Sequence, residues 1–209
     1  MADLEIIGIA FSNYVRSVRM LCEEKGIAHT LNPARPHGPE VMAIAPTGHV
    51  PCMRHGDVAL FESQAIATYI DKAFSGEKFI PEDARGNAET VQWISYGNAK
   101  VDRAIMREFV VPSTFFDKAK GPDTARIAAA VPEVEKCLAT LEKTIAKTGY
   151  LACGRLTFAD MNVLPMLNAL ANFPQGKEML ANHPALVAYM EKLSARPSYI
   201  ATAPPPRKK

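Results

Sequence analysis

The order of secondary-structure patterns along this chain constrains its fold more than any other feature. From residue 4 to residue 75, apolar β-branched stretches alternate with stretches of helical periodicity. They predict the order strand, helix, strand, short helix, strand, strand, helix. Beyond residue 86 we find no strand pattern, and the helical segments expected there are 87–118, with a break near Pro112, 124–147, 158–171 and 184–195. A shift from mixed α/β to all-α structure near residue 80 indicates two domains.

The domain boundaries follow from turn-forming residues and composition. We expect an α/β domain over 1–76, a linker over 77–86 that contains Pro81, Gly86 and several charged residues, and an all-α helical domain over 87–203. The proline-rich basic tail 204–209 is expected to be disordered.

Composition excludes several classes of protein. The chain has 209 residues, of which 48% are hydrophobic and 22% charged, which is the balance of a soluble globular protein. Three of its 24 Lys and Arg lie at 207–209, so the remaining 21 face 22 Asp and Glu, and nothing points to nucleic acid. Without a run of about 20 apolar residues or a signal peptide, the chain is expected to be cytoplasmic and not bound to a membrane.

The four cysteines are dispersed along the chain. Cys22, Cys52, Cys137 and Cys153 form no CxxC pair, and no His stands at a zinc-ligand spacing from them. We therefore expect reduced, buried thiols and neither a disulfide scaffold nor a metal site.

The stretch RLTFADMNVLPML carries a local structural signal. Thr157 and Asp160 have the spacing of a capping box, in which each side chain pairs with the other residue's backbone N–H. Leu156 and Met161 are placed to form the accompanying hydrophobic staple. This pattern predicts a helix start with a structural role, so Asp160 is not a catalytic candidate.

Pro51 interrupts a strand pattern in the stretch TGHVPCMRHGDVALFES. A cis Val50–Pro51 bond would turn the chain sharply and leave the backbone of Val50 free to pair with an extended peptide. Alternatively, Pro51 begins a strand, where its missing N–H does no harm. The sequence leaves both interpretations open.

Glu62 and Ser63 stand at the start of the next helical pattern. Ser63 is placed as an N-cap, but residue 66 is Ile, so no complete capping box forms and the first-turn N–H groups are open to an anion. Glu62 beside them could bind an ammonium group. An amino-acid-like ligand would suit the pair, but on this evidence alone an ordinary capped surface helix is the favoured interpretation.

Ser12 stands at the first strand-to-helix junction. It has the position of an N-cap, and no neighbouring His or Lys could make it a strong base. Its hydroxyl could instead donate a hydrogen bond to a thiolate or an oxyanion, assisted by the helix dipole and by Arg16.

With these residues in place, the chain resembles a cytosolic glutathione S-transferase of the bacterial type, with a serine-type active site. The resemblance covers nearly the whole chain. It rests on TGHVP…LFESQAI, on GRLTFADMNVLPM, and on FSNYVRSVRMLCEEKGI, which is similar to the serine-type classes. It implies a thioredoxin-like N-terminal domain, an all-helical C-terminal domain and a homodimer.

The resemblance also implies a set of binding residues. The backbone of Val50, before Pro51, would pair with the cysteinyl unit of glutathione, and Glu62 and Ser63 would hold its γ-glutamyl end. The resemblance also implies that His49, just before Val50, lies near the bound glutathione. Arg35 or His37 would meet the glycyl carboxylate.

The implied reaction is attack by the glutathione thiolate on a small hydrophobic electrophile, with glutathione as co-substrate and no metal. Ser12 would stabilise the thiolate. Tyr14 is the rival donor if the helix begins one turn later, and Asn13 is a weaker rival. Candidates for the electrophile pocket between the domains are Phe11, Tyr96, Val101, Met106 and Phe109, although residues of these types at helical spacing are more often core residues.

Two other functions share this fold. A non-catalytic protein that binds glutathione or apolar ligands would keep the Glu62–Ser63 site without useful turnover. A thiol oxidoreductase would want a cysteine where this chain has Ser12, and Cys22 lies about three turns into the helix, so it ranks last.

Overall fold

The structure, a computed structural model, describes residues 3–205 and divides into two compact units. The first unit comprises the chain up to Glu82 together with the segment from Ala195, and the second is Asp83–Ser194. The unit boundary falls inside the linker expected from the sequence. The segment from Ala195, which we expected to belong to the helical domain, is part of the first unit. The tail expected to be disordered lies outside the described residues from 206 onward.

The first unit is built on a mixed four-stranded sheet. Its strands are β1 Leu4–Ile7, β2 His29–Asn32, β3 Cys52–His55 and β4 Val58–Phe61, in the order β2-β1-β3-β4. β1 is parallel to β2 and antiparallel to β3, which forms the expected hairpin with β4. This is the thioredoxin-like fold that the resemblance implies.

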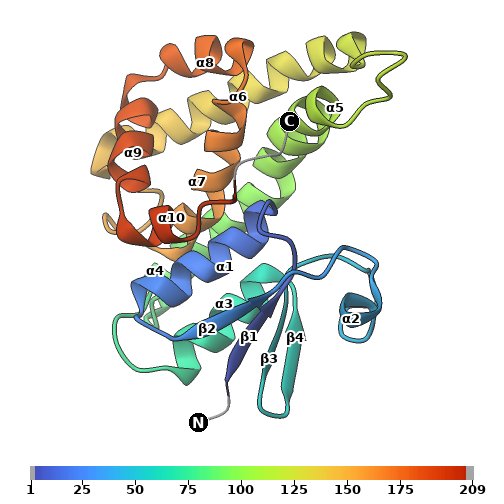
Figure 1. The fold of residues 1–209 in the computed structure, drawn as a ribbon. Coiled ribbons are helices and arrows are strands. Elements are labelled where there is room, and N and C mark those ends of the chain that lie inside the picture. Colours follow the sequence, from blue (N-terminus) through green and yellow to red (C-terminus); the bar gives the residue numbers. More distant parts are fainter. Residues whose placement is uncertain (1–2, 206–209) are drawn as a thin grey trace. The chain divides into compact units, whose positions relative to one another are not determined.

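Helices cover both faces of this sheet (Figure 1). They are α1 Asn13–Glu24, α2 Pro39–Met42 and α3 Ser63–Ala73, whereas α10 Pro197–Ala201 packs on α1. α1 packs against α3, β1 and α10. On one face, Ile7 and Cys52 join a buried cluster with Val41 of α2. Because side chains alternate along a strand, Ile6 and Met53 lie buried on the opposite face.

The described part of the second unit is helical. Its helices are α4 Ala84–Tyr96, the π-helix η1 Gly97–Val110, α5 Val111–Thr114, α6 Thr124–Thr148, α7 Phe158–Leu170, α8 Pro174–Ala181 and α9 Pro184–Ser194. The long helix expected over 87–118 is thus one helical run that ends at Thr114, shortly after Pro112. Pro132 lies inside α6, and α8 was not expected from the sequence.

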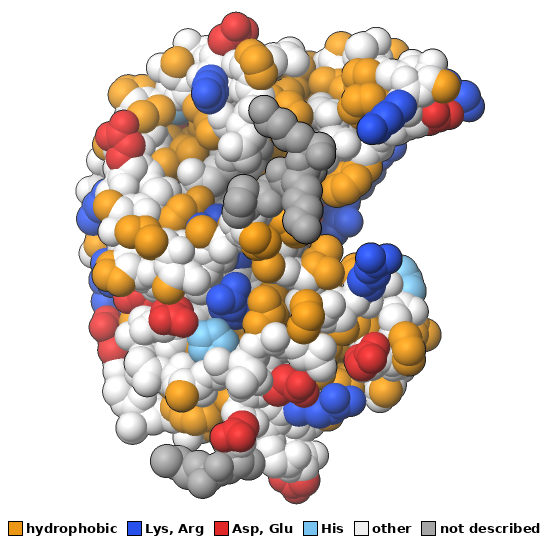
Figure 2. Space-filling model, viewed as in Figure 1, with side chains coloured by type: hydrophobic (Ala, Val, Ile, Leu, Met, Phe, Trp, Pro, Cys, Tyr) orange, Lys and Arg blue, Asp and Glu red, His pale blue; other side chains and the backbone are white. Residues whose placement is uncertain are grey.

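The surface of the molecule carries charges of both signs. On the face shown in Figure 2, Lys and Arg side chains are interspersed with Asp and Glu side chains, without a continuous patch of one sign. Among residues 3–205, no helix combines the length and the apolar character that crossing a membrane requires.

Candidate functional site

The register of the sheet gathers the predicted site residues at one end. Ile7 pairs with Cys52, and Cys52 pairs with Phe61, so these three residues form one row across β1, β3 and β4. Because neighbouring strands in this row are antiparallel, the chain after Ile7, before Cys52 and after Phe61 leaves the sheet at the same end. Figure 1 shows these connections beside the start of α1. The residues on them are Ser12, His49, Val50, Pro51, Glu62 and Ser63.

The Val50–Pro51 peptide bond is cis. Pro51 precedes β3, which begins at Cys52, and among residues 3–205 neither the N–H nor the C=O of Val50 has a hydrogen-bond partner. The sequence left open whether this bond is cis or Pro51 simply begins a strand. The structure shows the cis bond, which leaves the Val50 backbone free to pair with a peptide. A Cβ on Gly8, whose φ is 152°, would stand 2.9 Å from Val50 Cβ and 2.6 Å from Val15 Cγ2, so the connections after β1 and before β3 touch.

His37 and His49 lie next to each other at this end of the sheet. The His37 N–H donates to the carbonyl of Gly48 at 2.8 Å, and the two imidazole rings meet edge to face with centroids 5.9 Å apart. The ring of His37 occupies the space that a Cβ on Gly48 would need. His37 and His49 are both exposed, as is Arg35 in the same loop, so a guanidinium and two imidazoles are available to an anion here.

Glu62 and Ser63 form the junction between β4 and α3. The helix begins at Ser63, so the N-cap is Glu62 and the N-cap expected at Ser63 is wrong by one residue. The shift arises because Glu62 takes φ 68° and ψ 119°, a conformation that non-glycine residues rarely adopt and that occurs preferentially at functional sites. No side chain caps this helix end, and the Glu62 carboxylate is exposed while Ser63 is buried. Within residues 3–205, no side chain therefore caps the first-turn N–H groups of α3, which lie beside an exposed carboxylate.

Ser12 is the N-cap of α1, as the sequence predicts. Its Oγ accepts from the Val15 N–H at 3.4 Å, and its own hydroxyl proton stays available for donation. α1 begins at Asn13, so Tyr14 lies within the first turn. The condition under which Tyr14 would replace Ser12, a helix that begins one turn later, is not met.

The five candidates for the electrophile pocket differ in burial. Val101 and Phe109 are fully buried in the second unit, which agrees with the alternative interpretation that they are core residues. Tyr96 and Met106 are half-buried, and Phe11 is exposed.

The capping box of α7 is present as expected. The Asp160 carboxylate accepts from the Thr157 N–H at 2.8 Å and from Leu151 N–H at 2.9 Å. Leu156 and Met161, the expected staple, are both buried. The Asp160 carboxylate thus has a structural role, because its hydrogen bonds fix the start of α7.

All four cysteines carry free thiols. Cys22, Cys52 and Cys137 are buried as expected, whereas Cys153 is only half-buried. Burial raises the pKa of Cys22 to about 12, which keeps this thiol protonated and unreactive at neutral pH. Within residues 3–205, no group of three or more His, Cys, Asp or Glu side chains is arranged to hold a metal ion.

Sequence reasoning missed two features of this end of the sheet. Tyr199 contacts Arg16 of α1 across 183 residues of sequence, and Gly48 provides the space for His37. A contact between positions so distant leaves no periodic signal. The sequence TGHVP includes Gly48, but it does not indicate that the His37 ring packs against this glycine.

Comparison with known protein families identifies both parts of the chain. Residues 6–78 match the family model of the glutathione S-transferase N-terminal domain, and residues 102–197 match that of the glutathione S-transferase C-terminal domain. Together these two matches cover most of the chain.

Individual relatives extend over almost the whole length. The chain is 28% identical to glutathione S-transferase 3 of Zea mays, with 99% of this chain and 98% of the relative covered. Its fold is similar to the structure of a glutathione S-transferase III in apo form, with a TM-score of 0.85, 27% identity and full coverage of both chains. It is also similar to a theta class glutathione S-transferase of Xanthomonas axonopodis pv. citri with glutathione bound, with a TM-score of 0.82, 26% identity and coverage of 97% and 98%.

Proposed function

The chain belongs to the glutathione S-transferase family, and on that premise we propose that it binds glutathione at the end of the sheet where Ser12, Val50, Glu62 and Ser63 meet. The enzyme conjugates glutathione by activating its thiolate for attack on a hydrophobic electrophile. The observation that carries this proposal is the sheet register. It brings three connections, far apart in sequence, to one end of a sheet in a chain that carries both domains of the family.

Each part of glutathione has a matching group at this site. The unpaired N–H and C=O of Val50, fixed beside Pro51, pair with the cysteinyl unit as a further strand would. The open first turn of α3 and the Ser63 hydroxyl receive the γ-glutamyl carboxylate, and the exposed Glu62 carboxylate receives the amine. The adjacent imidazoles of His37 and His49, with Arg35 nearby, receive the glycyl carboxylate.

Ser12 holds the glutathione sulfur as a thiolate. A free thiol with a pKa of about 8.5 is mostly protonated at neutral pH, and lowering its pKa by about 2 requires about 2.7 kcal/mol of preferential stabilisation. A hydrogen bond to a charged acceptor supplies about 1.5 to 3 kcal/mol, and the N-terminus of α1 adds about 0.3 to 1 kcal/mol. Ser12 therefore acts as a donor and does not need to accept a proton.

The other expectations from the resemblance stay predictions. These are the serine-type site of the bacterial type, the homodimer, the cytoplasmic location, the absence of a metal and the small size of the electrophile. The similar proteins include one from the plant Zea mays and one from the bacterium Xanthomonas axonopodis pv. citri, so their sources do not decide whether the chain is of the bacterial type.

Two measurements test the proposed function. Calorimetry with glutathione should show binding that weakens in Glu62→Gln and in Ser63→Ala, because each change removes a contact to the γ-glutamyl end. Steady-state conjugation of a chloronitroarene should fall by about 10²-fold in Ser12→Ala and stay within about threefold in Tyr14→Phe.

Three results would contradict the proposal. Absence of glutathione binding at millimolar concentration would refute the site. A protein that binds glutathione but shows no turnover in the native form would be the non-catalytic alternative, which the relatives do not favour. If the conjugation rate fell in Tyr14→Phe and stayed at the native value in Ser12→Ala, Tyr14 and not Ser12 would be the residue that contacts the thiolate.

A further inference from the structure

His37 and His49 differ from the other histidines of the chain in the partners of their rings. The chain has five histidines, and the rings of the other three have polar partners within the fold: His29 contacts Glu23 and the carbonyl of Ile27, His55 contacts Tyr69, and His183 contacts Glu135. Among residues 3–205, no ring nitrogen of His37 or His49 has a hydrogen bond or an ion pair. These two imidazoles are therefore available to a ligand.

The backbone around His37 holds its ring beside His49. His37 has φ 60°, in the left-handed region, which few non-glycine residues adopt but in which histidine is enriched. Glu62, at the opposite end of the proposed glutathione site, has φ 68°. Backbone strain of this kind clusters at functional sites. The His37 N–H donates to the Gly48 carbonyl and the ring packs against Gly48, so the fold fixes the two imidazoles as neighbours.

The charged and titratable groups around the pair come from three elements. Arg35 lies in the loop before α2, and its carbonyl accepts from the Gly38 N–H at 3.0 Å. Glu40 lies in the first turn of α2, and its Oε2 would stand 3.7 Å from a Cβ on Gly38. Cys52 of β3 donates its S–H to the His49 carbonyl at 3.7 Å, and burial raises the pKa of this thiol. Because arginine and glutamate stay charged and such a thiol stays neutral between pH 6 and pH 8, the imidazoles are the groups of this neighbourhood that gain or lose charge there.

Two neighbouring imidazoles accept a first proton more readily than a second. The ring centroids of His37 and His49 are 5.9 Å apart, and two positive charges at this distance repel each other. A carboxylate that comes to lie beside one imidazole favours its protonated form. The pair is therefore suited to take up one proton when it binds one carboxylate.

We propose that the His37–His49 pair makes recognition of the glycyl carboxylate dependent on one proton, which the protein takes up from solution together with its ligand. This inference rests on the proposed function, which places the glycyl carboxylate at the pair but assigns no proton to it. At low pH the pair carries its positive charge before the ligand arrives, and the affinity is highest. As the pH rises, that proton has to be drawn from an increasingly dilute supply, so the affinity falls. The pair thus selects γ-glutamyl peptides with a free C-terminal carboxylate, and selects them most strongly at acidic to neutral pH.

Calorimetry with S-methylglutathione tests this inference. This ligand is an S-alkyl conjugate, the type of product that the proposed reaction forms, and it has no thiol whose ionisation would obscure the proton. Titrations at pH 7 in buffers of different ionisation enthalpy should show an uptake of about 0.4 proton per ligand. The affinity should fall about fivefold from pH 6 to pH 8, which is the factor that an exposed ion pair supplies.

The glycyl ethyl ester of S-methylglutathione is the matched control ligand. It keeps the γ-glutamyl carboxylate and the amine but lacks the glycyl carboxylate, so the difference between the two ligands isolates that group. The ester should bind more weakly than the acid at pH 6, with an uptake below about 0.1 proton, and the two affinities should converge toward pH 8.

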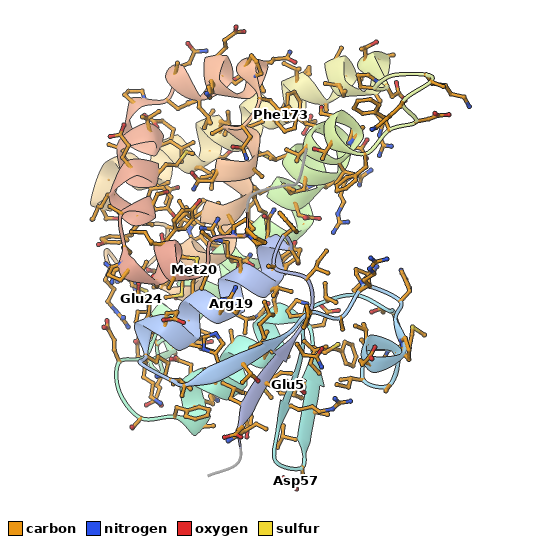
Figure 3. The ribbon with its side chains drawn as sticks, viewed as in Figure 1. Glu5, Arg19, Met20, Glu24, Asp57 and Phe173 are labelled. Atoms are coloured by element: carbon orange, nitrogen blue, oxygen red, sulfur yellow. The ribbon has the colours of Figure 1, made fainter. Side chains whose placement is uncertain are left out.

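Variants of the pair locate the proton. The double change His37→Asn and His49→Gln replaces both imidazoles with amides, which do not titrate, and Asn tolerates the left-handed backbone of residue 37. It should abolish the uptake, whereas each single change should retain part of it. His55→Gln is the control in the same unit. His55 ends β3, next to the hairpin turn where Figure 3 labels Asp57, and its change should leave the native uptake.

Three results would overturn this inference and leave the proposed function standing. They are binding of S-methylglutathione without proton uptake, equal uptake with its ethyl ester, and full uptake in the double variant. If the double variant does not bind, the comparison of the two ligands on the native protein decides. Absence of glutathione binding by the native protein would overturn both the inference and the proposed function.

Discussion

The hydroxyl of Tyr189 on α9 donates a hydrogen bond to the Asp160 carboxylate at the start of α7, at 3.2 Å. Both side chains are buried, at 2% and 0% exposure. The same carboxylate accepts from the backbone N–H groups of Leu151 and Thr157, so one acidic group joins two helices and the loop before α7. This network belongs to the second unit and makes Asp160 a structural residue.

Removal of this carboxylate should destabilise the protein strongly. Asp160→Ala leaves buried donors of Leu151, Thr157 and Tyr189 without an acceptor, and we expect the free energy of unfolding to fall by about 3 to 5 kcal/mol. Tyr189→Phe removes one donor and should cost about 1 kcal/mol. Urea denaturation followed by circular dichroism measures both. Equal losses in the two variants would contradict a carboxylate shared by several donors.

The stability of the protein should depend on pH through Asp160. Burial raises its pKa from 3.8 to about 6, although hydrogen bonds from Leu151, Thr157 and Tyr189 act in the opposite direction. A carboxyl group with a raised pKa in the folded state favours folding in its protonated form. Its contribution is complete below about pH 4 and is lost as the pH rises through about 6, an effect of about 3 kcal/mol.

Asp160→Asn isolates this effect, because an amide does not titrate. The difference in unfolding free energy between native protein and variant should change between pH 4 and pH 7. The native protein should become less stable relative to the variant as the pH rises. Parallel curves over this range would show that the folded-state pKa of Asp160 is not raised.

Local patterns were enough to predict most of the fold. The hairpin of β3 and β4, the helix from Ser63 and the capping box at Thr157 all follow from periodicity and turn residues within a few positions. α8 and α10 were missed because they are short and bury few apolar side chains, which leaves little periodic signal. The π-helical run of η1 was also not foreseen, since its side chains follow a pattern close to that of an α-helix.

The candidate site was predictable as a set of residues but not as a geometry. Spacing indicated Ser12, Val50 and Glu62, yet it left the Val50–Pro51 isomer open and placed the N-cap one residue late, at Ser63. The support of Arg16 by Tyr199 depends on how the segment from Ala195 packs on α1, which no local pattern specifies.

Glu142 of α6 caps α9 from outside that helix. Its carboxylate accepts from the N–H of Ala185 at 3.1 Å and from that of Leu186 at 2.7 Å. Glu142→Ala should therefore lower the free energy of unfolding by about 1 to 2 kcal/mol, because two first-turn donors lose their acceptor. Glu133→Ala is the control on the same helix, since its exposed ion pair with Lys136 contributes little. A Glu142→Ala protein as stable as the control would show that water replaces the cap without cost.

Gly48 should matter for glutathione binding, although it carries no side chain. It has φ 69°, and a Cβ at this position would overlap the His37 ring, so Gly48→Ala must both strain the backbone and displace His37. We expect about 1 kcal/mol of lost stability and about tenfold weaker glutathione binding, because the glycyl carboxylate loses an imidazole contact.

Gly26→Ala provides the matched control for this change. Gly26 has φ 64°, and nothing lies within 4 Å of the added Cβ, so it carries the same backbone strain without the overlap. Calorimetry should then show native glutathione affinity in Gly26→Ala and reduced affinity in Gly48→Ala at similar stability. Equal affinities in the two variants would show that the position of His37 over Gly48 is not needed for binding, and the glycyl carboxylate would have to be held by His49 or Arg35 instead.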